Sequence, residues 1–183
     1  MKKSLSLLII AIIALTSSIN ANAWTDRNTF NLKGPVKAVY DETYDNSNLY
    51  FEEDGTYIPP GDEYTETLPD VSRNSAGKIE SLTNAGALWY IEYKYNKKGQ
   101  VIKTERWDGN SSFTKTSYTY NAKGQVIKEI IKSGFSDVRG SKVVCTDVIT
   151  YTYQKFDSYG NWIKRTAKVG RKSTVETRTI TYY

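Results

Sequence analysis

The sequence predicts an all-β protein, an antiparallel meander of repeated β-hairpins that forms an open or partly rolled sheet. Aromatic side chains and threonine, which favour strands, are abundant. Turn motifs recur along the chain, and no window beyond residue 23 has the apolar periodicity of an amphipathic helix. A chain of 183 residues is long enough for one domain with a hydrophobic core.

The first 23 residues have the pattern of an export signal. Lys2 and Lys3 give a positive start, residues 5–15 are apolar, and residues 21–23 read Ala-Asn-Ala, a typical cleavage site. The apolar stretch is shorter than the roughly 20 residues that span a bilayer. No cysteine follows it for lipid attachment. We therefore expect cleavage after Ala23 and an exported product, periplasmic or secreted, without a membrane span.

The mature part begins with an acidic N-terminal segment, residues 24–88, which holds a predicted strand at 36–40 and weak turn motifs ending at Gly55 and Gly77. Residues 89–183 carry the clearer repeats and end in a predicted strand at 177–183. We expect both parts to form one continuous domain.

Three segments, residues 95–103, 120–128 and 156–164, share one pattern. Each reads aromatic, Asn or Asp, two variable residues, Gly, a polar residue, an apolar residue, Ile and Lys. The first turn residue accepts hydrogen bonds from the backbone, and the glycine adopts a left-handed conformation, which together make a three-residue hairpin loop. The predicted turn residues are Asn96, Gly99, Asn121, Gly124, Asp157 and Gly160.

The third copy is irregular. In the first two copies a tyrosine lies two residues before the turn aromatic, whereas Tyr153 lies three residues before Phe156. One extra residue reverses the face that the preceding side chains occupy, so we predict a bulge at Gln154 or Lys155. The wider spacing before Gly160 also predicts a longer hairpin, with residues 134–140 at its tip.

This motif resembles the YD repeats of RHS-type bacterial surface proteins. The similarity covers about residues 50–183 and is strongest over 89–170, although two copies have Asn in place of Asp and the third has Phe in place of Tyr. The resemblance implies a coiling sheet of hairpins without catalytic residues in the repeat. The shells that very long arrays build around toxin domains do not carry over to a chain of this length.

Charge is divided between the two parts of the mature chain. Residues 24–88 hold 5 basic and 12 acidic residues, whereas residues 89–183 hold 18 and 8. Lys103, Lys128 and Lys164 occupy one repeat position, so stacked hairpins would align them. With Trp162, expected to share a face with Lys164, they form a candidate ligand surface for a polyanion such as an acidic polysaccharide. The alternatives are that the two halves neutralise each other or that lysines only solubilise strands.

Several chemistries are excluded by composition. The chain has no histidine and one cysteine, so it has no histidine-based triad, no histidine-ligated metal and no intramolecular disulfide. Cys145 lies in a predicted strand and is expected to be buried as a small hydrophobic residue. The alternative is a reactive thiol or an intermolecular disulfide. The acidic segment 52–70 offers oxygen ligands for Ca²⁺ or a glycosidase carboxylate pair, but its spacing matches no known calcium loop. We assign no catalytic residue, cofactor or metal.

The leading hypothesis is a non-enzymatic exported binding module for an envelope polysaccharide or a protein partner. Export and the absence of a nucleic-acid motif argue against a nucleic-acid partner. The alternatives are a carbohydrate-active enzyme with a carboxylate pair, and a structural element that pairs with a partner through its sheet edges.

Overall fold

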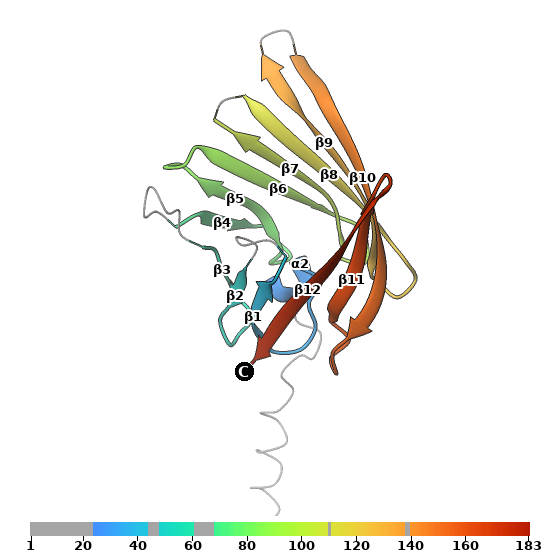
Figure 1. Ribbon diagram of the computed structural model, residues 1–183. Helices are drawn as coiled ribbons and strands as arrows, with labels where there is room; N and C mark the ends of the chain where they lie inside the picture. The colour runs from blue at the N-terminus through green and yellow to red at the C-terminus, as the bar shows by residue number, and fades with distance from the viewer. Residues whose placement is uncertain (1–23, 44–47, 61–67, 110, 138–139) are drawn as a thin grey trace, which may run out of the picture.

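The computed structural model describes residues 24–43, 48–60, 68–109, 111–137 and 140–183, and these residues form one curled antiparallel sheet (Figure 1). Strands β4 to β12 follow one another in chain order, and β12 then pairs with β1, which continues through β2 to β3. The predicted all-β meander is confirmed, and the sheet is not closed into a barrel. The acidic segment and the repeat region share this sheet.

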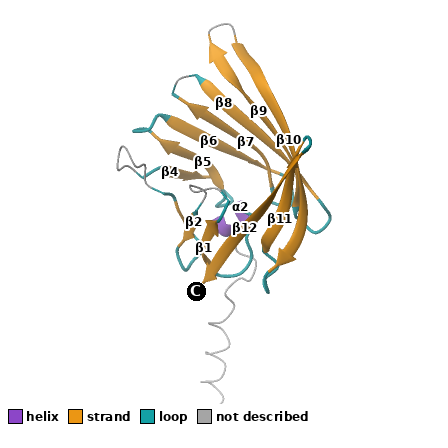
Figure 2. Cartoon of the chain, in the orientation of Figure 1, coloured by secondary structure: helices purple, strands orange, loops and turns teal. Residues whose placement is uncertain are grey.

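The strands lengthen toward the middle of the repeat region (Figure 2). Their bounds are β1 (Val36–Asp41), β2 (Leu49–Phe51), β3 (Tyr57–Ile58), β4 (Asp70–Arg73), β5 (Ile79–Asn84), β6 (Trp89–Tyr95), β7 (Val101–Asp108), β8 (Ser112–Tyr120), β9 (Val126–Asp137), β10 (Gly140–Phe156), β11 (Trp162–Val169) and β12 (Lys172–Tyr182). The described helix is the single turn α2 (Asp26–Thr29). No helix among the described residues is long and apolar enough to cross a membrane.

One turn geometry recurs five times. In the copy at Asn96, the Gly99 N–H donates to the Asn96 carbonyl, and the Asn96 N–H donates to the Gln100 carbonyl, both at 2.9 Å. The Asn96 side chain accepts from the N–H groups of Lys98 and Gln100, which fixes the loop. Gly99 has φ +81°, in the left-handed region that glycine adopts without steric cost. The same pair of backbone bonds closes the turns that end at Gly55, Gly77, Gly124 and Gly160.

Each repeat is tied to the previous one by a side-chain donor. The Tyr95 hydroxyl donates to the Ile79 carbonyl at 2.6 Å, and the Tyr120 hydroxyl donates to the Val101 carbonyl at 2.6 Å. Each acceptor lies two residues after a turn glycine, next to a bulge where the strand register shifts. These hydrogen bonds link each hairpin to the next in addition to the strand ladder.

The predicted irregularity in the third copy is confirmed. Gln154 is a bulge, because Tyr153 pairs with Arg165 while Lys155 pairs with Lys164. The long hairpin is also present as β9–β10, but residues 134–137 and Gly140 belong to its paired strands and not to its tip. Cys145 lies in β10, as predicted, but it is exposed, so its predicted burial is wrong. The β9–β10 hairpin extends past α2 and the short strands β1–β3, which therefore do not cover its far part (Figure 1).

The N-terminal segment, residues 24–35, crosses the inside of the curl and meets the repeated turns (Figure 1). Trp24 packs edge-on against Tyr95, with the two ring centroids 5.8 Å apart. Further along, Asn31 donates to the Gly124 carbonyl, and Lys33 and Asn161 exchange two hydrogen bonds of 2.8 Å. The leader prediction concerns residues 1–23, which lie outside the described residues.

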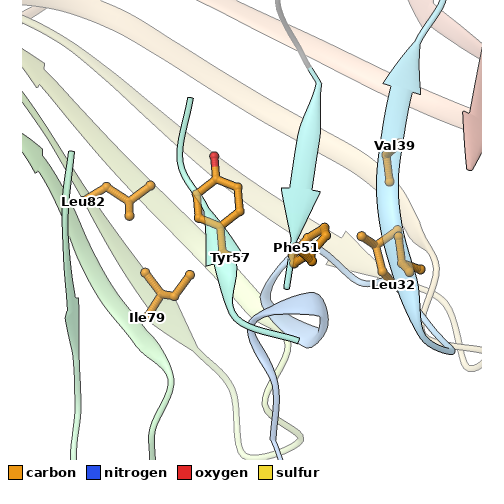
Figure 3. Close-up of a cluster of buried hydrophobic side chains, with 7 residues drawn as sticks. Leu32, Val39, Phe51, Tyr57, Ile79 and Leu82 are labelled. Carbon is orange, nitrogen blue, oxygen red and sulfur yellow. The ribbon is translucent and has the colours of Figure 1, made fainter. Parts of the chain in front are cut away.

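The hydrophobic core lies where this segment meets both ends of the sheet (Figure 3). Side chains of β2 and β3 point toward those of β5, and Leu32 fills the space beside β1. The buried cluster consists of Leu32, Val36, Val39, Phe51, Tyr57, Ile79 and Leu82. The core therefore joins strands that are far apart along the sheet and gives it its curvature.

Candidate functional site

The strand register sorts charged residues of the repeat region onto two faces. Side chains alternate along a strand, and directly paired residues share a face. One face lines the inside of the curl, where the core and α2 lie; we call it the concave face, and the other the convex face. Register places a set of lysines from β8 to β11 on the convex face: Lys115, Lys128, Lys132, Lys155, Lys164 and Lys168. We call this set the convex lysine face.

No described carboxylate side chain of β8–β11 lies on the convex lysine face. Glu129 pairs with Tyr118, and Asp147 pairs with Ile131, so both carboxylates belong to the concave face. In addition, Lys155 lies directly opposite Lys164, a like-charge pair that weakens a sheet. The face therefore carries a concentrated positive charge. This charge does not help the strands to pair, because like charges on neighbouring strands repel each other.

The three lysines chosen from the sequence differ in their surroundings. Lys103 forms an ion pair with Glu105, which also lies 3.2 Å from Lys115. These bonds lower the pKa of Glu105, the hydrogen bond from Lys103 being the largest cause. Lys128 and Lys164 have no ion-pair partner among the described residues. Register places all three on the convex side, in an oblique row rather than a straight ladder.

Trp162 is separated from these lysines. A second bulge at Ile163 puts Trp162 opposite Phe156 and Lys164 opposite Lys155, on opposite faces. The expectation that Trp162 and Lys164 share a face is therefore wrong. The guanidinium carbons of Arg165 and Arg178 lie 4.1 and 3.9 Å from the Trp162 ring centroid on the concave side.

Trp162 belongs to a buried charged cluster on the concave face. The Arg165 Nε lies 2.6 Å from Glu176 Oε2, and Glu176 is buried. Burial, followed by the nearby Arg165, lowers the pKa of Arg178 to about 10. Burial raises the pKa of Glu129, which Arg165 partly opposes. Because Glu176 is held by Arg165 and buried, the cluster presents no open pair of carboxylates for acid and nucleophile roles.

A hollow of about 410 Å³ lies on the concave face over β6–β9, bordered by Thr29 of α2 and the two residues that follow it. Its lining combines apolar side chains with many hydroxyl groups, and no carboxylate borders it. The lining residues are Thr29, Phe30, Asn31, Ile91, Tyr93, Val101, Thr104, Arg106, Thr114, Thr116, Tyr118, Tyr120 and Val126. Sequence reasoning missed this hollow. The available signal was that Thr114 and Thr116 are two residues apart in a strand and therefore share a face.

Sequence reasoning also missed four of the six lysines of the convex lysine face: Lys115, Lys132, Lys155 and Lys168. Lys128 and Lys132, and likewise Lys164 and Lys168, are four residues apart in predicted strands. An even spacing puts both members of each pair on the same face, which was the available signal.

No known protein family and no curated protein matches this chain. Across the described ranges, no three acidic or cysteine side chains gather as a metal ion requires. Asp62, Glu63 and Glu66 of the acidic segment lie outside the described residues.

Proposed function

We propose that this protein is an exported, non-enzymatic binding module that holds an acidic polysaccharide against the convex lysine face. The observation that carries the proposal is the concentration of lysines without carboxylates on the convex side of β8–β11. Such a surface attracts polyanions through the summed field of its charges. The repulsion between Lys155 and Lys164 would be relieved by a bound anion.

The spacing of the lysines favours an extended polymer. Two lysines of β9 are four residues apart, and so are two lysines of β11. Each two therefore lie about 13 Å from each other along their strand. An acidic polysaccharide presents carboxylate or sulfate groups at regular intervals, whereas a small anion would meet one lysine at a time. The export signal at residues 1–23 and the YD-like motif support a ligand of the bacterial envelope.

Two alternatives have less support. A glycosidase would require two accessible carboxylates, but none borders the hollow, and Glu176 is occupied by Arg165. A strand-pairing element would require a free sheet edge. The Tyr57 N–H at the β3 edge is already bonded to Asp26, which also pairs with Arg73 of β4.

The test is binding of the 24–183 protein to neutral and acidic polysaccharides at low and high salt. We expect binding to acidic polymers only, weakened by salt as screening requires. Changing Lys128, Lys164 and Lys168 together to Gln should lower the affinity at least tenfold.

The matched control changes Lys97, Lys98 and Lys123 to Gln. These exposed lysines lie in the hairpin turns, outside the convex lysine face. Both variants lose the same net charge. Equal loss of binding in the two variants, or no binding to any acidic polymer, would overturn the proposed function.

A further inference from the structure

The hollow on the concave face has the size and composition of a small-molecule site. Its volume of about 410 Å³ falls within the range of ligand pockets, which begin near 300 Å³. Strands β6–β9 supply most of its lining, and Thr29 of α2 with Phe30 and Asn31 supplies the rest. The site is independent of the convex lysine face, which lies on the other side of the sheet.

The chemistry of the lining selects a neutral ligand. Ile91, Val101 and Val126 contribute apolar side chains to the lining. The cation at the border, Arg106, is already neutralised, because its Nε and Nη2 donate to Asp108 Oδ1 at 3.0 and 2.8 Å. Binding an anion there would first require breaking this ion pair.

Hydroxyl groups of the lining can form hydrogen bonds with a ligand. They come from Thr104, Thr114 and Thr116 and from two tyrosines, Tyr93 and Tyr118. Hydroxyls both donate and accept, so they match the hydroxyl groups of a polyol or sugar. Thr104 and Tyr118 interact only across a long distance, 3.4 Å between oxygens, which leaves both able to bond a ligand.

Tyr93 lines the hollow and has a hydroxyl available to a ligand. The hydroxyls of two neighbouring tyrosines on the same face are already bonded, because Tyr95 and Tyr120 each donate to a main-chain carbonyl. The Tyr93 hydroxyl has no hydrogen-bond partner among the described residues, although the side chain lines the hollow. Burial raises the pKa of Tyr93, so its hydroxyl stays a proton donor. The Tyr93 hydroxyl can therefore donate a hydrogen bond to a ligand that enters the hollow.

We propose that the hollow binds a neutral, hydroxylated ring compound of glycoside size. The apolar face of the ring would lie on Ile91, Val101 and Val126, and a ring hydroxyl would accept the hydrogen bond from Tyr93. The threonines would exchange hydrogen bonds with the remaining hydroxyl groups.

The experiment is calorimetric titration of the 24–183 protein with 4-nitrophenyl glycosides. The neutral set comprises the β-glucoside, β-galactoside, α-mannoside and N-acetyl-β-glucosaminide; the charged comparison is the β-glucuronide. We expect at least one neutral glycoside to bind with a Kd below about 1 mM and the glucuronide to bind more weakly. Tyr93→Phe should weaken that binding about fivefold, the effect of one neutral hydrogen bond, with the unfolding midpoint unchanged.

Thr114→Phe should abolish binding by filling the hollow. Its control is Thr119→Phe, the same change at an exposed position of β8 on the convex face. The proposal is overturned if no neutral glycoside binds, if the glucuronide binds best, or if binding survives both Tyr93→Phe and Thr114→Phe. None of these outcomes bears on polysaccharide binding by the convex lysine face.

Discussion

The Tyr153 hydroxyl donates a hydrogen bond of 2.6 Å to the main-chain carbonyl of Val126, two residues after a turn glycine. In the other two copies, Tyr95 and Tyr120 donate to the equivalent carbonyls. Both are the aromatic residue that directly precedes the turn. In the third copy that position is Phe156, which has no hydroxyl. The bulge at Gln154 accompanies this replacement and allows Tyr153, three residues earlier, to take the same role.

Tyr153→Phe should therefore lower the free energy of unfolding by about 1–2 kcal/mol, because one hydrogen bond is lost and its acceptor is left without that donor. Urea unfolding, monitored by circular dichroism, measures this loss in the free energy of unfolding. Tyr50→Phe is the control, since the Tyr50 hydroxyl has no described partner and should cost almost nothing. Equal stability of Tyr153→Phe and the parent protein would contradict the role of this bond.

Gly99 and Gly77 share a left-handed backbone but differ in surroundings. A methyl group on Gly99 would lie 2.5 Å from Trp24 Cζ3, whereas nothing lies within 4 Å of one on Gly77. We expect Gly77→Ala to cost about 1 kcal/mol from backbone strain and Gly99→Ala to cost at least about 1 kcal/mol more from the clash with Trp24. In a Trp24→Ala background the extra cost should vanish. If it persists, Trp24 does not dock against this turn.

Asp26 connects the two open edges of the sheet. Its Oδ2 accepts from the Tyr57 N–H of β3 at 2.9 Å and pairs with Arg73 of β4. Asp26→Ala should lower stability by about 2 kcal/mol and speed hydrogen exchange at the Tyr57 amide, because a buried donor loses its acceptor. Arg73→Gln should cost less, since Asp26 still holds Tyr57. Unchanged exchange at Tyr57 in Asp26→Ala would refute the connection.

Glu129 makes the stability depend on pH in an unusual direction. Burial raises its pKa in the folded protein above the ordinary value, so the folded state binds this proton more tightly than the unfolded state does. Its contribution to stability is therefore lost as pH rises through the raised pKa. Glu129→Gln should be more stable than the parent at pH 7, with the gain fading toward pH 4. A gain independent of pH in paired urea titrations would exclude this cause.

Cys145 should react in the folded protein, because it is exposed on β10. Its Sγ donates to Asp147 Oδ2 at 3.5 Å, and this bond and the carboxylate charge raise the pKa of Cys145. Only the thiolate attacks, so Asp147→Asn should speed the reaction with a disulfide reagent at pH 8. Asp108→Asn, also on the concave face, is the control. A thiol that reacts only in denaturant would contradict the exposure.

Local pattern was sufficient to predict the hairpins. Asn or Asp followed three residues later by Gly specifies one turn through short-range hydrogen bonds. The extra residue before Phe156 predicts a bulge at Gln154 or Lys155 by counting alone, and the register places it at Gln154. The burial of Cys145 was predicted incorrectly because an apolar run in a strand does not reveal whether another element covers it. The position of Trp162 was missed because the bulge at Ile163 reverses its face.

The sequence by itself determined the strands, the turns and the lysines at alternating positions, since each depends on neighbours a few residues away. Tertiary structure alone decided that β1 pairs with β12, that residues 24–35 lie inside the curl, and that Asp26 holds both edges. It also gathered the lysines of four strands on one face and placed Tyr93 in the lining of the hollow. These relationships depend on curvature and on contacts between residues distant in the chain, which no local pattern encodes.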